Sequence, residues 1–235
     1  MTDAARRDEL AASLAQVRER IARACVAAGR APDEVALVAV TKTYPASDVV
    51  LLAGLGVTDV GESRDQEAAP KAAEARAAGA TPRWHFIGQL QRNKVRSVAG
   101  YAGVIESVDS VRLVTALENA VAGRPEQLEV LIQVSIDGDS SRGGAAGDDL
   151  WRISDAVAAT TALRLGGVMA VAPRDWEPDR AFEQLAVLAA QLAGKHPGAT
   201  TISAGMSGDL EAAVRHGATH VRIGTSLLGM RNLLR

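Results

Sequence analysis

A lysine ends the first apolar segment of the chain and is the residue best suited to carbonyl chemistry. Residues 35–41 are apolar or small, and Lys42 follows them directly. Such a short, valine-rich run is typical of a strand buried on both faces, on which Lys42 would share a face with Val38 and Val40. We therefore expect Lys42 to be buried, because burial favours the neutral amine that attacks a carbonyl carbon to form a Schiff base. The alternative is a lysine that caps the strand and points into solvent, since lysine is rarely fully buried.

Two glycine-containing turns near the end of the sequence could bind a phosphate group. Each of them, at residues 203–209 and 222–226, follows a predicted strand. Backbone N–H groups at a helix start attract anions together with the helix dipole, and Ser207 would add a hydroxyl group to the first turn. The same serine could instead simply cap the helix. Because the two turns are adjacent in the last two strand–helix units, together they favour a phosphorylated ligand.

Arg222 lies on a predicted strand, where alternation places it on the same face as His220 and Gly224. The other face of this strand is apolar and should meet the surrounding helices. Arg222 would then point into the protein, where an unpaired guanidinium is costly. We expect it to meet either a ligand or a carboxylate, and an internal ion pair with Glu62 is an equally good expectation.

The elements that must position these residues alternate between strand and helix. Short apolar segments predict eight strands, over residues 35–42, 57–60, 83–87, 102–106, 128–134, 163–168, 200–203 and 220–223. Helices are predicted over residues 4–28, 46–53, 65–78, 92–99, 111–122, 148–158, 179–193 and 209–216. Repeated strand–helix units imply parallel strands, and eight of them predict an α/β fold, a single (β/α)8 TIM barrel. An open doubly wound sheet is the alternative.

No linker divides the sequence, so we expect a single domain over residues 1–235, with residues 1–30 forming an extra N-terminal helix packed on the barrel. In such a barrel the site forms from residues that follow the strands, which include Lys42, Ser63 and Met169. The segment 135–147, rich in Asp, Ser and Gly, is expected to be a surface loop at the same end.

Composition excludes several classes of partner. The hydrophobic share of 47% is sufficient for a large core, whereas the aromatic share of 3% and the net charge of −2 argue against nucleic acid and anionic membranes. Cys25, the single cysteine, has the helical spacing of a core residue. No signal peptide and no run of 18 apolar residues occur, so we expect a cytoplasmic protein, and, without a long exposed apolar strip, a monomer.

Six segments together resemble a known family, the pyridoxal phosphate homeostasis proteins. They are residues 38–43, 61–67, 84–94, 167–169, 205–209 and 221–225. The resemblance extends over nearly the whole chain from about residue 30, and the segment 84–94 is especially specific. The family shares the barrel of the alanine racemase N-terminal domain, which agrees with the fold expected from the pattern of strands and helices.

The resemblance implies a site for pyridoxal 5′-phosphate (PLP). Lys42 would form the Schiff base with PLP, Ser207 and the backbone of Gly224 and Thr225 would bind its phosphate, and Arg222 would face the pyridine nitrogen. An arginine donates a hydrogen bond but no proton to that nitrogen, which leaves the ring a weaker electron sink. The full set of expected cofactor-binding residues is Lys42, Ser63, Met169, Ser203, Gly205, Met206, Ser207, Arg222, Gly224 and Thr225.

The resemblance also implies a non-enzymatic protein that holds PLP, delivers it to PLP-dependent apoenzymes and affects amino-acid and keto-acid pools. One alternative is a slow PLP-dependent racemase or lyase, and another is a Schiff-base aldolase that works without a cofactor. The resembling racemases take a second base from a tyrosine of another domain. The only tyrosines here, Tyr44 and Tyr101, are not placed in the sequence for that role.

Three residues depart from the family pattern. Ser63 replaces the usual asparagine, so the contact made by that asparagine is in question. Arg142 replaces a loop lysine and keeps the charge but cannot form an imine, which argues against a cofactor relay through that loop. Ala204 replaces a methionine beside the first phosphate turn.

Overall fold

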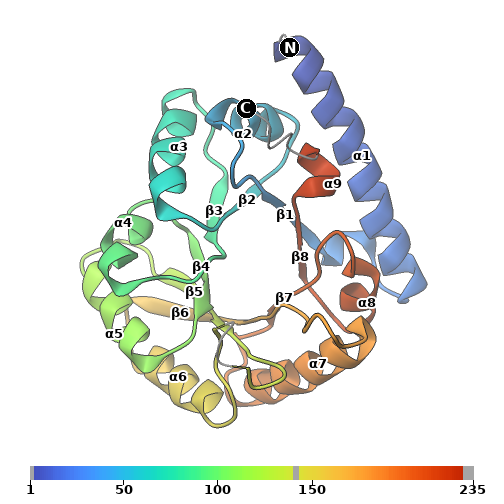
Figure 1. Ribbon diagram of the computed structural model, residues 1–235. Helices are drawn as coiled ribbons and strands as arrows, with labels where there is room; N and C mark the ends of the chain where they lie inside the picture. The colour runs from blue at the N-terminus through green and yellow to red at the C-terminus, as the bar shows by residue number, and fades with distance from the viewer. Residues whose placement is uncertain (1–2, 140–142, 230–235) are drawn as a thin grey trace.

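Eight parallel strands, each hydrogen-bonded to the next in chain order, close into a barrel in which β8 pairs with β1 (Figure 1). The computed structural model describes residues 3–139 and 143–229. The strands are β1 (Ala36–Val40), β2 (Asp59–Glu62), β3 (Arg83–Phe86), β4 (Val104–Val108), β5 (Leu128–Gln133), β6 (Leu163–Met169), β7 (Thr201–Ser203) and β8 (His220–Ile223). The predicted (β/α)8 barrel is therefore confirmed, and the open sheet is excluded.

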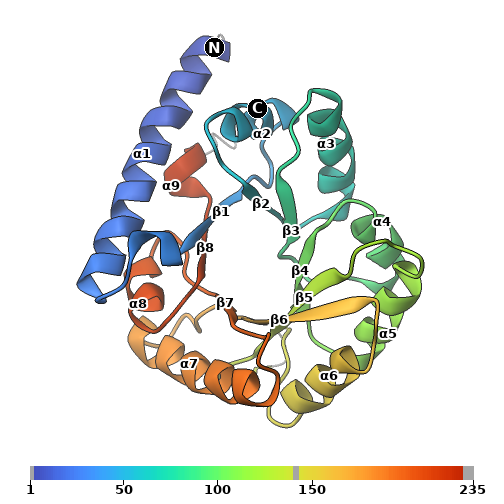
Figure 2. The ribbon, with the colours of Figure 1, turned by 180° about the vertical axis from the view of Figure 1, so that it is seen from behind.

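The helices surround the barrel and cover the outer faces of the strands (Figures 1 and 2). The α-helices are α1 (Asp3–Ala27), α2 (Ala46–Gly54), α3 (Asp65–Ala77), α4 (Val95–Ala99), α5 (Val111–Ala120), α6 (Asp149–Ala158), α7 (Pro178–Lys195), α8 (Leu210–Arg215) and α9 (Thr225–Leu228). Two 3₁₀ turns, η1 (Pro32–Glu34) and η2 (Arg92–Lys94), complete the elements. The short helix α9 and the turn η1 were not predicted, and the helix predicted over residues 92–99 is divided between η2 and α4.

Two strand boundaries differ from the prediction in a way that changes the site. The second strand was predicted over residues 57–60, but the N–H group of Val57 bonds to Leu52 and closes the end of α2. The strand starts at Asp59 and continues to Glu62, so Glu62 is a strand residue. The first strand was predicted to reach Lys42 but ends at Val40, because the chain turns where the N–H group of Tyr44 bonds to the oxygen of Thr41.

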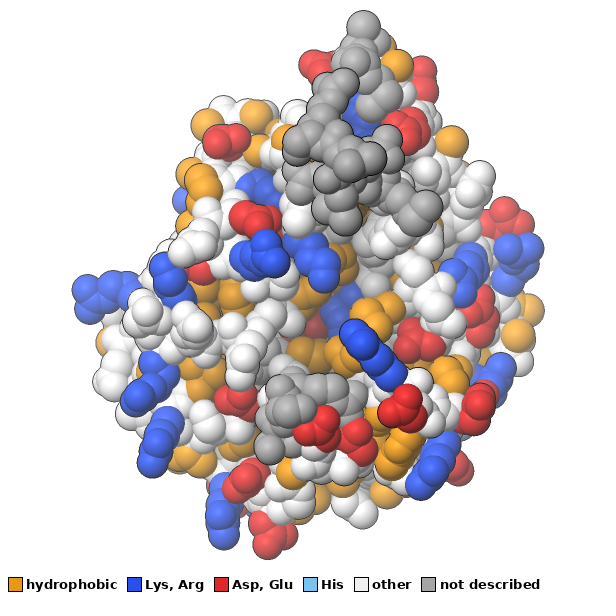
Figure 3. All heavy atoms as spheres, viewed as in Figure 1, with side chains coloured by type: hydrophobic (Ala, Val, Ile, Leu, Met, Phe, Trp, Pro, Cys, Tyr) orange, Lys and Arg blue, Asp and Glu red, His pale blue; other side chains and the backbone are white. Residues whose placement is uncertain are grey.

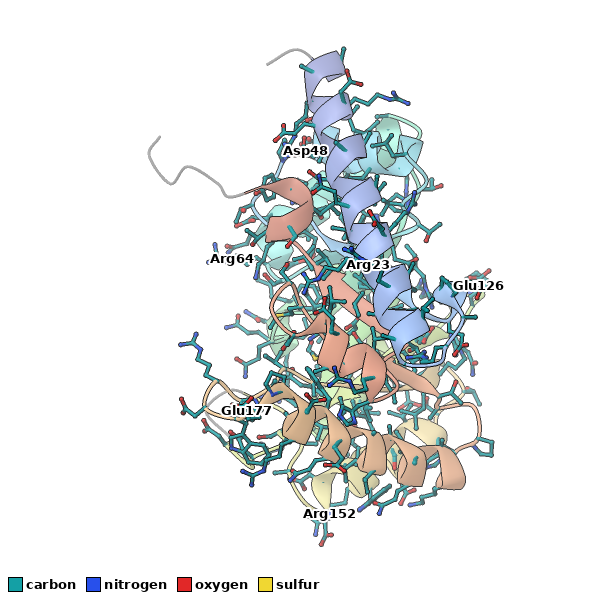
Figure 4. All side chains as sticks on the ribbon, turned by 90° about the vertical axis from the view of Figure 1, so that its right-hand side faces the viewer. Arg23, Asp48, Arg64, Glu126, Arg152 and Glu177 are labelled. Atoms are coloured by element: carbon teal, nitrogen blue, oxygen red, sulfur yellow. The ribbon has the colours of Figure 1, made fainter. Side chains whose placement is uncertain are left out.

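Helix α1 packs along one side of the barrel, beside α8 and α9 in both ribbon views (Figures 1 and 2). Its buried residues Leu10, Leu14, Val17 and Ile21 recur with helical spacing and join the core that contains the outer faces of β1 and β8. Arg6 forms a buried ion pair with Asp48, which lies beside α1 in Figure 4. Apolar packing and ion pairing therefore both attach α1 to the barrel.

Among the helices of the described residues, none combines the length and apolar content needed to cross a bilayer.

Shortening a buried side chain of α1 should destabilise the whole barrel if α1 unfolds together with it. Ile21 is 4% exposed, so Ile21→Ala should lower the free energy of unfolding by about 2–5 kcal/mol through lost burial and a cavity. The matched control is Val26→Ala on the same helix, because Val26 is 68% exposed and its truncation should change stability by less than about 0.5 kcal/mol. Urea unfolding followed by circular dichroism measures both, and equal stabilities for the two variants would contradict the expectation.

Candidate functional site

The predicted site residues meet at one end of the barrel. All of them lie at or just beyond the carboxyl ends of β6, β7, β8, β1 and β2, which are consecutive around the barrel. In Figure 4 this end is marked by Arg64 and Glu177, whereas Glu126, in the loop before β5, lies at the opposite end. The face drawn in Figure 3 is hollowed near its centre, and basic side chains lie around the hollow. The barrel thus brings together residues that are far apart in the sequence.

Lys42 is exposed, and the expectation that it is buried was wrong. Thr41 is the last residue whose N–H group continues the ladder, bonding to the oxygen of Gly61 at 3.0 Å, and it is fully buried. Lys42 follows Thr41 in the turn after the strand, so its side chain is not part of the buried face of β1. Across the seam between β1 and β8, Gly224 lies beside Val40, and a β-carbon added to Gly224 would be 3.4 Å from the oxygen of Val40. Lys42 is therefore a mouth residue beside the last strand.

Arg222 points into the barrel, as predicted, and it meets a carboxylate there, but that carboxylate is not Glu62, the example we expected. Its Nη1 donates to the backbone oxygen and to Oγ of Ser203 at 2.8 and 2.7 Å, and its Nη2 donates to the oxygen of Ala170 at 2.8 Å. Glu62 cannot reach it, because Glu62 faces outward from β2 and pairs with Lys71 of α3 at 2.6 Å. The acidic partner of Arg222 is instead Glu106, at 3.8 Å.

Glu106 is the centre of a buried polar network in the barrel interior. It accepts a hydrogen bond from Ser203 Oγ at 2.6 Å and lies 2.6 Å from His85 Nδ1. The other ring nitrogen of His85 lies 3.0 Å from Asp59. The network therefore runs from Asp59 through His85, Glu106 and Ser203 to Arg222, and it alternates negative and positive groups.

Electrostatics sets the charge of each member. Burial alone would lower the pKa of His85, but its hydrogen bonds to Asp59 and Glu106 outweigh burial and raise the pKa to about 9. Burial alone would raise the pKa of Glu106, but the hydrogen bond from His85 and the charge of Arg222 hold it below its usual value. Burial lowers the pKa of Arg222, yet an arginine in a protein keeps its proton. At neutral pH this network therefore holds two cations and two anions.

Asp59, His85 and Glu106 were not among the predicted site residues. The available signal was a charged residue within a mostly apolar strand, as at Glu106 of β4. On β3 the alternation also separates His85 from Trp84 and Phe86, which join the outer core clusters. The alternation of residues shows which side chains face the barrel interior, but it does not show which of them contact one another there.

The first glycine-containing turn, residues 203–209, has a capped geometry. Asp209, rather than Ser207, occupies the N-cap position of α8, so the interpretation of Ser207 as the helix cap is wrong. Asp209 Oδ1 accepts a hydrogen bond from the N–H group of Met206 at 2.6 Å. Gly205 has φ of 91°, and a β-carbon there would lie 2.7 Å from that of Ala213, so only glycine fits. Ser207 is half-buried beside this turn, and the Met206 side chain is exposed.

The second turn leads directly into α9. Gly224 is its N-cap residue, and the helix starts at Thr225. The N–H groups of Thr225 and Ser226 belong to the first turn of a helix, where no carbonyl oxygen of the same helix can accept them. Both residues are exposed. This helix start can therefore present backbone donors and hydroxyl groups to an anion at the mouth.

The other residues that the sequence singled out lie in different environments. Ser63 follows β2 and is half-buried, and Gly88 approaches its backbone so closely that an added β-carbon would be 2.2 Å from the oxygen of Ser63. Met169 is buried in the barrel interior with Val104 and Leu131. Ala204 is buried in the outer core. Arg142 lies outside the described residues.

The hydroxyl group of Tyr44 is hydrogen-bonded, and that of Tyr101 is buried. The Tyr44 hydroxyl donates to the oxygen of Gly229 at 2.6 Å. The ring of Tyr101 packs edge-on against Trp84, with 6.2 Å between ring centroids, and burial raises the pKa of its hydroxyl. Their arrangement agrees with the expectation that neither tyrosine opposes Lys42.

Comparison with known sequences finds similarity along almost the entire chain. The family model described as alanine racemase, N-terminal domain, matches residues 12–232. A pyridoxal phosphate homeostasis protein of Mycobacterium leprae is 47% identical over 244 residues, which cover 97% of this chain and 95% of the relative. A protein of the same name from Escherichia coli is 39% identical over 229 residues, covering 96% of this chain and 98% of the relative.

Solved structures give a consistent result. PipY of Synechococcus elongatus, solved with PLP bound, is 30% identical with a TM-score of 0.81, covering 94% of this chain and 100% of that chain. The alanine racemase of Bacillus anthracis has a TM-score of 0.69 at 16% identity, covering 97% of this chain and 57% of that chain. At this low identity, the likeness to the racemase concerns the fold alone.

The charge of His85 should make stability fall as pH rises. The folded protein keeps the His85 proton up to about pH 9, whereas a histidine in the unfolded chain loses it near 6.5, so folding takes up a proton between these values. The stabilisation is complete below pH 6.5 and is lost as pH rises through 9, a change of about 3 kcal/mol in the free energy of unfolding.

Urea unfolding at a series of pH values measures this dependence. His85→Gln, which cannot carry the charge, should lack the fall in stability, whereas His216→Gln on the outside of the barrel should retain it. The same pH dependence in wild-type protein and in His85→Gln would show that His85 is not the responsible group.

Proposed function

Because the chain belongs to the pyridoxal phosphate homeostasis proteins, within the family of the alanine racemase N-terminal domain, we propose that it binds PLP at the carboxyl end of its barrel. PLP-bound PipY supports this proposal. The observation that carries it is the juxtaposition of an exposed lysine, a buried arginine with remaining hydrogen-bond donors, and a helix start at the same barrel mouth. The role we propose is to hold and release PLP within the cell's PLP supply, without catalytic turnover.

Arg222 suits the pyridine end of the cofactor. A guanidinium has five N–H donors, and the hydrogen bonds to Ser203 and Ala170 use three of them. Two donors remain, which is enough for one ring nitrogen. Because an arginine keeps its proton in a protein, Arg222 would bind the nitrogen without protonating it.

The start of α9 and the turn before α8 suit the phosphate. Backbone N–H groups of Thr225 and Ser226, the Thr225 hydroxyl and the Ser207 hydroxyl lie after adjacent strands, as the expected phosphate ligands should. The N–H group of Met206 is already satisfied by Asp209. We therefore propose that Met206 contributes through its position beside the turn rather than as a phosphate donor. Gly205 allows the close backbone approach in that turn.

Lys42 suits the aldehyde. When bound, PLP supplies an aldehyde carbon, and the Lys42 amine condenses with it to a Schiff base with loss of one water molecule. An exposed amine is accessible to an incoming aldehyde. Ser63 and Met169 complete the proposed site, Ser63 at its rim and Met169 beneath it in the barrel interior. We treat residues 1–235 as one PLP-binding domain in this proposal, with α1 as part of it.

A carrier role is favoured over catalysis by the tyrosines. Racemisation needs a second base opposite the lysine, and the hydroxyl of Tyr44 is committed to Gly229 while that of Tyr101 is buried. PLP-dependent apoenzymes are the proposed recipients, and a monomer is the proposed state. A slow racemase or lyase remains the alternative function, and the experiments below separate it from a carrier.

Borohydride reduction after addition of PLP should attach the cofactor to Lys42. We expect a visible absorption band in the wild-type protein, loss of the band after reduction, and a pyridoxyl mass on the peptide that contains Lys42. Lys42→Ala should abolish the band and the label, whereas Lys195→Ala, on the outer helix α7, should keep both. A wild-type protein that remains unlabelled would refute the proposed site.

The PLP-loaded protein should not exchange the α-proton of amino acids. Incubation with each amino acid in deuterated water, followed by NMR, should show no incorporation of deuterium above a Lys42→Ala control. Exchange that depends on Lys42 would identify the protein as a racemase or lyase and contradict the carrier role.

A further inference from the structure

The turn that carries Lys42 contains an unusual backbone conformation. Thr43 has φ of 71°, and over residues 3–139 and 143–229 no other residue except glycine has a positive φ. For a side chain branched at the β-carbon, such a conformation costs on the order of 1–3 kcal/mol. It persists only where surrounding contacts hold it, and here those contacts come from α3 and β2.

Two side chains of α3, one helical turn apart, bind the residues on either side of Lys42. Lys71 Nζ donates to the backbone oxygen of Thr41 at 2.8 Å. Glu67 Oε2 accepts a hydrogen bond from the backbone N–H group of Thr43 at 3.1 Å. Because residues four apart lie on the same face of a helix, α3 holds both neighbours of Lys42 at once.

Glu62 fixes Lys71 in this arrangement. Glu62 Oε1 lies 2.6 Å from Lys71 Nζ and accepts a hydrogen bond from the Thr41 hydroxyl at 2.7 Å. The side chains of Glu62 and Lys71 are 0% and 7% exposed. A buried ion pair is often no more stabilising than an apolar pair of the same size, so stability alone does not explain its presence. The ion pair does, however, hold Thr41 in position, because Glu62 binds its hydroxyl group and Lys71 binds its backbone oxygen.

We propose that Glu62, Glu67 and Lys71 are positioning residues that hold the Lys42 turn in the conformation in which the amine meets the PLP aldehyde. This inference rests on the proposed function. The three side chains bind only Thr41 and Thr43 of this turn, so they set the direction in which the Lys42 side chain leaves the backbone. Lysine has many rotamers, and holding a reacting group in one region of space accelerates its reaction.

Replacing the ion pair with an apolar pair separates positioning from stability. In Glu62→Leu/Lys71→Met the two buried charges leave together, which limits the loss of stability, although the buried hydroxyl and backbone oxygen of Thr41 lose their partners. The rate at which PLP is captured on Lys42, followed by visible absorbance and borohydride trapping, should fall about 10- to 100-fold. A folded double variant with a wild-type capture rate would overturn the proposal.

A second pair of variants avoids the buried charges. Glu67→Leu removes the acceptor of the Thr43 N–H group and should slow capture about 10-fold, whereas Glu67→Gln keeps an acceptor oxygen and should capture close to the wild-type rate. Equal rates in these two variants would also count against the proposal. The matched control is Lys195→Gln/Asp155→Asn, which removes a 2.6 Å ion pair on the outside of the barrel and should leave capture unchanged.

Amide hydrogen exchange tests the arrangement without the cofactor. The Thr43 amide should exchange faster in Glu67→Leu than in the wild type and in Glu67→Gln. If the wild-type protein captured no PLP on Lys42, the proposed function would fail, and the exchange of Thr43 would still decide whether α3 holds the turn. Unchanged protection in Glu67→Leu would refute the positioning role.

Discussion

A guanidinium that cannot lose its proton, enclosed in a barrel of short strands, is the constraint on which this structure depends. Arg222 is 4% exposed, and an uncompensated charge at that depth would cost more than a domain of this size can offset. Glu106 compensates the charge, and Ser203 connects the two by accepting from Arg222 and donating to Glu106. His85 and Asp59 then balance Glu106 in turn. The part of the barrel interior around this network is therefore polar, whereas many such barrels are filled with branched apolar residues.

Because side chains alternate along each strand, the inner and outer faces of the barrel wall carry different groups of polar residues. On the inner face the network ends at Arg222, near the mouth. On the outer face Glu62 and Lys71 form a second buried ion pair, against α3. Lys42 lies at the mouth, after the strand β1 that pairs with β8 and between the two residues that α3 binds. Its own side chain is exposed, while the residues before and after it are tightly held.

Similarity to the racemases concerns the barrel. The match covers 97% of this chain but 57% of the Bacillus anthracis racemase chain, and at 16% identity it supports a common fold only. A barrel of this kind can supply a lysine, an arginine and a helix start from its strand ends. The resembling racemases use, in addition, a tyrosine of another domain as a second base. In the described residues, the hydroxyl groups of both tyrosines lie in other environments.

Local sequence pattern alone determined the eight strands, the inward direction of Arg222 and the two glycine turns, because these depend on periodicity and on the conformations that glycine permits. It also identified Lys42 as the lysine that follows the first apolar segment, although the strand itself ends at Val40. Only the tertiary structure decided that Glu62 binds Lys71, that Lys42 is exposed, and that Glu106 meets Ser203. The last two residues are separated by 97 positions in the sequence. Such pairs depend on strand register and on closure of the barrel, since a shift of one residue reverses the face on which a side chain lies.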